Sequence, residues 1–347
     1  MLKLWKLFRK SSSKKLNCFY KMKKSTARNI WFGIFLILLL CAVFVLSLMT
    51  GAVKPSLVII KKLRLPRSSL VLLAGSLLGA SGAVFQRFFQ NPLAEPGLLG
   101  ISSGATLGAV LSVSLGSLSF LGGYISSINI FAFAGAFISG MILALISSLA
   151  GKKVSTVVVL LCGTAMGSLY SAVSSTMLLG KNKELYGIYT WILGSFNGRG
   201  INELRFVLLP AFFALVLMMF IAPFLDLLNG GEESAASLGV NIALLRFLVI
   251  TSGALAVSVA VCSGGTISFV GLISPHIMQR VFKCKSRFHI ILSACGGAIL
   301  LLISDVVCRT VIRPSELPCG IVISFLGAPF FIFVIFNNVL GKRRRNS

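Results

Sequence analysis

Four arginines are the side chains best suited to bind an anionic group, because each stands beside a long apolar segment that can hold it in place. A guanidinium offers a rigid fork of N–H donors that matches carboxylate and phosphate oxygens. A rim of such cations predicts an acidic partner or an anionic solute, and contact with lipid headgroups is an equally good interpretation of these residues alone. The four are Arg64, Arg67, Arg309 and Arg313.

A polar connection at 226–243 carries a second group of candidates. Glu232 and Glu233 precede alanine and leucine, which predicts a short amphipathic helix with its acids in the first turn, where the helix dipole favours them. Such a helix between two membrane spans is a natural docking element for a partner, whereas an ordinary solvated loop is the alternative. The residues of this element are Glu232, Glu233, Ser234, Ala235, Leu238 and Gly239.

Patterns for catalysis are missing from the sequence. There is no Gly-x-x-x-x-Gly-Lys-[Ser/Thr] loop, so the chain does not cradle nucleotide phosphates and any ATP must be used by another subunit. The deep ionisable residues, Glu95, His276 and Asp305, lie on three different segments, which argues weakly against a proton-driven carrier. No Ser/His/Asp group, paired carboxylates or metal-ligand spacing occurs. We therefore expect a protein that is not an enzyme and that binds no metal or cofactor itself.

The elements that position these residues follow from composition. Of 347 residues, 56% are hydrophobic and 12% are charged, with a mean hydropathy of +0.95, whereas soluble proteins average about 25% charged residues. Segments near the ~20 residues that cross a bilayer predict an all-α membrane bundle with ten transmembrane helices. The expected spans are 30–50, 68–88, 97–118, 127–150, 154–179, 204–224, 243–262, 266–282, 288–308 and 320–340. The eighth is short and contains Pro275, so a re-entrant helix is its alternative.

Basic segments at both ends predict the orientation. Residues 1–28 carry ten Lys/Arg and no acid, and residues 342–347 include Lys-Arg-Arg-Arg, so both termini are expected in the cytoplasm. This divides the chain into a basic extension at 1–28, a transmembrane domain at 29–341 and a basic tail at 342–347. The formal net charge of +25 lies largely in these flanks, where anionic lipid attracts it. Nucleic acid is therefore not an expected partner, and membrane lipid is.

The loop Asn91–Gly97 contains two prolines between apolar segments. Irregular backbone of this kind is tolerated at membrane depth only where protein covers it or where it lines a cavity. In addition, Gly97–Ser103 and Val270–His276 show a short likeness although the two segments are expected to run in opposite directions. Inverted repeats with irregular segments at matching positions are typical of transporters.

Several long motifs, in order, resemble the permease subunits of the iron-chelate and cobalamin ABC importers of the FecCD type. The resemblance covers nearly the whole chain after about residue 55. The motifs are Arg64-Leu65-Pro66-Arg67, Ser81-Gly82-Ala83-Val84-Phe85-Gln86, Asn91-Pro92-Leu93-Ala94-Glu95-Pro96-Gly97-Leu98-Leu99-Gly100, Gly265-Thr266-Ile267-Ser268-Phe269-Val270-Gly271-Leu272-Ile273-Ser274-Pro275-His276, Glu316-Leu317-Pro318-Cys319-Gly320 and Gly327-Ala328-Pro329-Phe330.

The resemblance implies a type II importer architecture and a set of roles. Two ten-span permeases would enclose a path, with two ATPase subunits, which use ATP and Mg²⁺, below and a solute-binding protein above. Arg64, Arg67 and Arg309, joined by Arg313, would receive acidic residues of the binding protein. Residues 232–239 would couple to the ATPase, although Asn229-Gly230-Gly231 departs from the usual Leu-x-Leu-Gly lead and leaves the helix start open. Ser155 and Thr156 would lie at the cytoplasmic gate, or serve packing and helix capping equally well.

The expected function is that of the membrane permease of an ATP-driven importer for an iron-siderophore or a similar bulky iron chelate. Haem and cobalamin are alternatives within the family, and a secondary carrier without an ATPase is the alternative from another class. The residues leave open the choice between a homodimer and a pairing with a sister permease. They also leave open whether Cys308 and Cys319, both expected near the outer face, form a disulfide.

Overall fold

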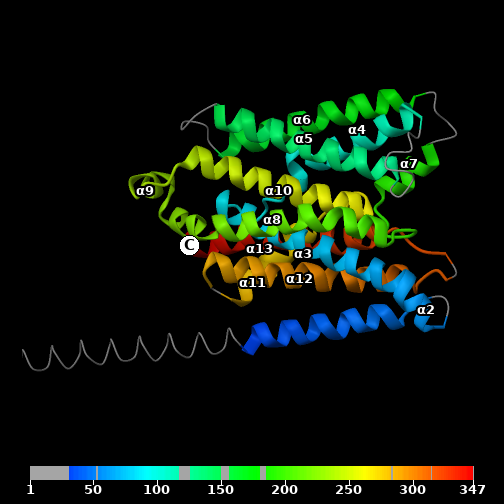
Figure 1. The fold of residues 1–347 in the computed structure, drawn as a ribbon. Coiled ribbons are helices and arrows are strands. Elements are labelled where there is room, and N and C mark those ends of the chain that lie inside the picture. The colour runs from blue at the N-terminus through cyan, green and yellow to red at the C-terminus, as the bar shows by residue number, and fades with distance from the viewer. Residues whose placement is uncertain are drawn as a thin grey trace, which may run out of the picture.

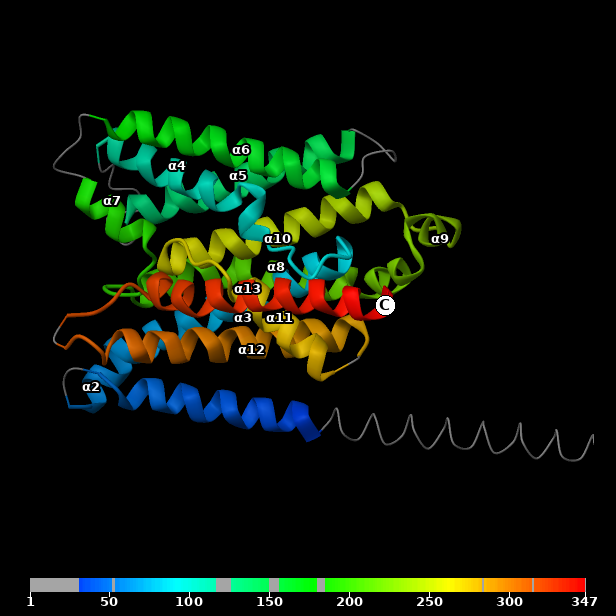
Figure 2. The ribbon, with the colours of Figure 1, turned by 180° about the vertical axis from the view of Figure 1, so that it is seen from behind.

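The computed structural model describes residues 31–51, 54–116, 126–149, 156–179, 185–282, 284–313 and 315–346. These residues form an all-helical bundle in which successive long helices alternate in direction (Figures 1 and 2). We call the end that carries α9 and the C-terminus the α9 end, and the opposite end, which carries α7, the α7 end. The predicted extension at 1–28 and the candidate Ser155 lie outside the described residues.

The helices follow the apolar segments of the sequence. The first is Trp31–Met49, at the edge of the bundle. The others are α2 (Leu57–Ile59), α3 (Leu65–Phe88), α4 (Ile101–Ser114), α5 (Ser127–Leu149), α6 (Thr156–Leu178), α7 (Leu185–Ile192), α8 (Ile201–Leu227), α9 (Glu232–Ser237), α10 (Ile242–Gly264), α11 (Val270–Val281), α12 (Ser286–Cys308) and α13 (Cys319–Asn346). Short irregular helices η1 (Ile60–Arg64), η2 (Pro96–Leu99) and η4 (Leu228–Gly230) join some of them.

Seven of the described helices are long and apolar enough to cross a membrane, against the ten spans predicted. The other three predicted spans correspond to shorter helices: α4 with 14 residues, α11 with 12, and the apolar stretch Cys319–Val334 of α13. Gly100 (φ +77°) and Phe269 (φ +67°) precede α4 and α11 in the left-handed conformation. Because a helix cannot continue through that conformation, the first residues of both predicted spans are lost from the helix.

Helix α3 is the centre of the bundle, with 17 of its 24 residues buried. Its glycines let neighbouring backbones touch it, as expected for close packing within a membrane. A Cβ atom built on Gly79 would lie 2.1 Å from the carbonyl oxygen of Ser293 on α12, and one built on Gly82 would lie 1.8 Å from that of Gly271 on α11. These contacts hold α11 and α12 directly against α3.

The two-proline loop after α3 is covered by protein, as its sequence required. Ala94 and Glu95 are buried, and the carboxyl group of Glu95 accepts hydrogen bonds from the backbone N–H groups of Phe269 and Gly271 at the start of α11. A carboxylate in this position satisfies two N–H donors that the first turn of a helix leaves unpaired. The loop from the first half of the chain thereby fixes the start of a short helix in the second half.

Candidate functional site

The predicted short helix in the 226–243 connection is α9, at one end of the bundle (Figure 1). It begins at Glu232 after Gly231 (φ +95°), and Gly239 (φ +90°) follows it. Such φ values favour glycine because it has no Cβ. Ala235 is buried against the bundle, whereas Leu238 is 68% exposed. The element is thus a short projecting helix that packs against the bundle through Ala235 and is followed by an apolar side chain, Leu238, exposed to solvent.

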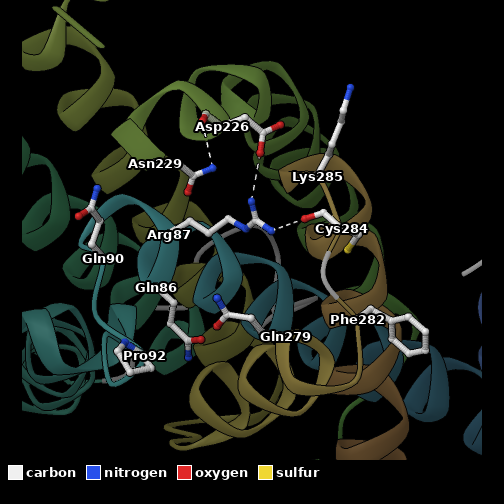
Figure 3. Close-up of a pocket in the computed structure, with 10 residues that line it drawn as sticks. All are labelled: Gln86, Arg87, Gln90, Pro92, Asp226, Asn229, Gln279, Phe282, Cys284 and Lys285. Atoms are coloured by element: carbon white, nitrogen blue, oxygen red, sulfur yellow. Dashed lines mark hydrogen bonds and ion pairs between the residues drawn. The ribbon is translucent and has the colours of Figure 1, made fainter. Parts of the chain in front are cut away.

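A cavity of about 950 Å³ lies beside the chain that leads into α9 (Figure 3). Its walls come from the end of α3, from the end of α8 with η4, and from the connection between α11 and α12. Most of its side chains are polar, including several amides. The lining residues are Gln86, Arg87, Gln90, Pro92, Asp226, Asn229, Gln279, Phe282, Cys284 and Lys285.

Arg87 joins the three walls of this cavity. Its Nη1 donates to Asp226 Oδ1 (3.1 Å), and its Nη2 donates to the carbonyl oxygen of Cys284 (2.6 Å) (Figure 3). Its Nη1 also donates to Ser286 Oγ (2.7 Å). Asp226 Oδ1 also accepts from the backbone N and the Oγ of Ser286, at 2.9 and 2.6 Å. Burial raises the pKa of the Cys284 thiol, so this wall contributes a neutral group. The network fixes the end of α8, which continues through η4 into α9.

Sequence reasoning missed this network. Arg87 and Asp226 are 139 residues apart, and nothing in their local patterns pairs them. The one available signal was that each is a charged residue at the end of an apolar segment, where a counterion is needed if the side chain faces the bundle.

The opposite, α7 end holds an ion cluster built around Arg67. Its guanidinium donates to both carboxylate oxygens of Glu316, at 3.0 and 2.9 Å, and to Asp305 Oδ1 through Nε (3.2 Å) and Nη2 (2.8 Å). The Nη2 of Arg309 lies 2.8 Å from Asp305 Oδ2, out of line for a hydrogen bond, so this contact is a charge pair. Asp305 is fully buried and shared by two cations.

Three of the four arginines predicted to face a binding protein therefore have partners inside the chain. Arg309 also donates to Ser47, with its Nη2 2.7 Å from Ser47 Oγ. Arg64 is 7% exposed and donates to the carbonyl oxygens of Leu48 and Met49. Arg313 is exposed. The docking role of all four stays a prediction, but only Arg313 presents its side chain freely at the surface.

The remaining candidates are placed as follows. Thr156 begins α6, but its side chain lies outside the described part, as does Ser155. Cys308 and Cys319 are buried free thiols that hydrogen-bond to each other. Among the described residues, no group of three or more His, Cys, Asp or Glu side chains is arranged to hold a metal ion.

The whole-chain comparisons agree with this architecture. A model of the FecCD transport family matches residues 31–337. The vitamin B12 import system permease protein BtuC of Salmonella typhi is 37% identical over 280 residues, 80% of this chain and 83% of BtuC. The ABC transporter permease protein YvrB of Bacillus subtilis is 35% identical over 288 residues, 82% of this chain and 80% of YvrB.

Solved structures resemble the chain in the same way. An inward-facing conformation of a metal-chelate type ABC transporter matches with a TM-score of 0.79 and 28% identity, over 88% of this chain and 99% of that one. PsaBC from Streptococcus pneumoniae in complex with Fab, at a TM-score of 0.57 and 20% identity over 78% and 90% of the two chains, shares the fold. The chain therefore belongs to the FecCD transport family, as a multi-pass membrane permease subunit of an ABC importer without a catalytic domain of its own.

Proposed function

We propose that the chain crosses the membrane ten times in a type II importer, with both termini on the cytoplasmic side at the α9 end. The alternating helix directions and the C-terminus of α13 at that end support the topology (Figures 1 and 2). The short helices α4 and α11 each complete a crossing together with the irregular segment before them. The basic segments 1–28 and 342–347 then lie where positive charge is retained.

We propose that α9 docks the ATPase that an ABC import permease requires. Its support is the exposed Leu238 that follows this helix, whose first turn carries the acidic pair, at the end where a cavity opens next to the base of α9. ATP binding would draw two ATPase subunits together, and α9 would carry that motion into a bundle with outward-open and inward-open states. The observation that carries this proposal is a short helix that projects from the bundle and exposes an apolar side chain.

Copurification tests the docking proposal. Leu238→Asp should lower the amount of coexpressed ATPase captured with the tagged permease by about tenfold or more, since truncating a central apolar anchor costs ~2 kcal/mol. Val311→Asp is the matched control, because Val311 is 62% exposed at the opposite end of the bundle. Equal capture by Leu238→Asp and the control would refute docking through α9.

At the α7 end we propose a solute-binding protein as the partner, with Arg313 as the exposed cation that meets its acidic residues. Arg64, Arg67 and Arg309 would stabilise the loops of this surface through their bonds within the chain. They would contact the partner only through the atoms that remain exposed to solvent. Surface plasmon resonance against the binding protein would distinguish the roles. Arg313→Glu should weaken binding without altering the thermal stability of the permease.

We propose a bulky metal chelate as the cargo, an iron-siderophore first and cobalamin or haem as alternatives. The similarity to a metal-chelate type transporter supports the first, and that to BtuC supports cobalamin. A largely apolar cavity of about 610 Å³ between the α7–α8 connection and α13 supplies few polar groups, as suits a path that must release its solute. A second permease, identical or a sister chain, would complete the path.

Uptake into proteoliposomes containing the permease, its ATPase and the binding protein tests the cargo. Ferric siderophores, cyanocobalamin and haemin would be compared with and without vanadate. Vanadate-sensitive uptake of one of these that requires the ATPase is expected. Uptake that persists without the ATPase would refute the importer mechanism and favour a secondary carrier.

A further inference from the structure

Arg246, in the second turn of α10, is the largest fully buried side chain among the described residues, with 1% of it exposed. None of its three guanidinium nitrogens has a hydrogen-bond partner within the described chain. A guanidinium does not lose its proton in proteins, so a charge with unsatisfied donors lies inside the bundle. Such an arrangement is costly unless a counterion approaches.

Helix α5, which packs along α10, supplies no counterion for Arg246. Helices α5 and α10 are antiparallel, with Gly140 against Ala254 and Met141 against Thr251. This register places Ser147 at the level of Arg246. The Ser147 hydroxyl is itself buried and has no partner among the described residues. At the level of Arg246, helix α5 therefore offers the guanidinium a neutral hydroxyl and no carboxylate.

The carboxylate in reach of Arg246 belongs to α9. Glu232 Oε2 lies 3.9 Å from Arg246 Nη2, and the Glu232 side chain is 40% exposed. At 3.9 Å the two groups attract each other but are not hydrogen-bonded, whereas a charge-assisted hydrogen bond needs about 2.8 Å. Glu233, the neighbouring acid, is exposed and makes no ion pair with the described residues. The two adjacent acids of α9 thus face different surroundings.

We propose that Arg246 is the positioning residue for α9: it holds this helix to the bundle through Glu232 and leaves Glu233 to meet a cation of the ATPase. This inference rests on the proposed docking role of α9. A movement of α9 of about 1 Å toward α10 would close the Arg246–Glu232 pair into hydrogen bonds. Because α10 packs against α3, α5 and α8, the pair ties the docked helix to the centre of the bundle.

A charge swap tests whether Glu232 pairs with Arg246 while Glu233 contacts the ATPase. The permease is coexpressed with its ATPase, and the amount of ATPase captured with the permease is measured. Glu232→Arg places two cations against each other and should lower capture roughly tenfold. Adding Arg246→Glu should restore capture to within about twofold of the unmodified chain. Glu233→Arg should lower capture to a similar extent, and the same Arg246→Glu should not rescue it. Rescue specific to Glu232 is an effect that general destabilisation would not produce.

If chains with Arg246→Glu fail to fold, a double-mutant cycle with milder substitutions tests the Arg246–Glu232 interaction. Glu232→Gln and Arg246→Met should each reduce capture, and the double variant should be no worse than the more severe single variant. Full additivity in this cycle, or an unrescued swap in a folded chain, would overturn the Arg246 inference. Undiminished capture by Glu233→Arg and Leu238→Asp would instead overturn the docking role of α9 itself.

Discussion

The buried carboxylate of Asp305 makes the sharpest stability prediction. Asp305→Asn keeps the shape of the side chain but removes the charge shared by Arg67 and Arg309, whose nitrogens lie 2.8 Å from its two oxygens. After the change, Glu316 is the carboxylate left to the two arginines within this cluster. Glu316→Gln is the matched control, because it removes the more exposed carboxylate of the same cluster and leaves Asp305 in place.

The magnitudes follow from burial. Asp305 is 0% exposed, and leaving buried cations without their counterion costs about 3–5 kcal/mol. The side chain of Glu316 is 25% exposed, and a partly solvated pair is worth about 1 kcal/mol or less. With roughly 2–4 °C per kcal/mol, Asp305→Asn should lower the melting temperature by roughly 6–20 °C, and Glu316→Gln by roughly 4 °C or less.

Thermal unfolding of the purified permease in detergent, followed by intrinsic fluorescence, measures both shifts. Equal shifts for the two variants, or no shift for Asp305→Asn, would refute the reasoning that Asp305 is the counterion at the centre of the cluster. Unfolding at two salt concentrations adds a check. The loss caused by Asp305→Asn should hardly change with salt, because buried pairs are weakly screened.

A further prediction concerns the packing of α3 against α11. Gly82→Ala should destabilise the permease by ~3 kcal/mol, because its Cβ would lie 1.8 Å from a carbonyl oxygen and overpacking costs about 1–3 kcal/mol. Gly33→Ala, with open space around it, should be neutral in the same melting assay, and equal shifts for the two variants would contradict the prediction.

The helices that could be predicted from the sequence are those whose signals are local. The span of α3 follows from an unbroken apolar run, and the existence of the short helix α9 follows from acids that precede alanines and a leucine. The residue at which α9 starts did not follow, because Asn229-Gly230-Gly231 left it open. The short lengths of α4 and α11 could not be predicted with the same rules. They depend on left-handed residues at Gly100 and Phe269, and a phenylalanine in that conformation has no sequence signal.

The direction in which the charged side chains point was also beyond the sequence. Proximity to a span end made Arg64 and Arg309 candidates for an anionic partner, and the structure shows that their side chains donate to backbone carbonyl groups of other segments. Those partners leave no local sequence signal. Arg246 is the clearest case. An arginine four residues into a helix after a polar loop is normally solvated, yet this one is enclosed by the bundle.

The ion cluster at the α7 end also bears on the order in which the protein is assembled. Arg67 is bonded to residues 238 and 249 positions later in the chain. Until α12 is made and inserted, the guanidinium at the start of α3 has neither of these carboxylates, and an unpaired charge at the membrane is costly. The final segments therefore supply the counterions that the early helices lack, and a chain truncated before Asp305 would keep the charge of Arg67 without these two partners.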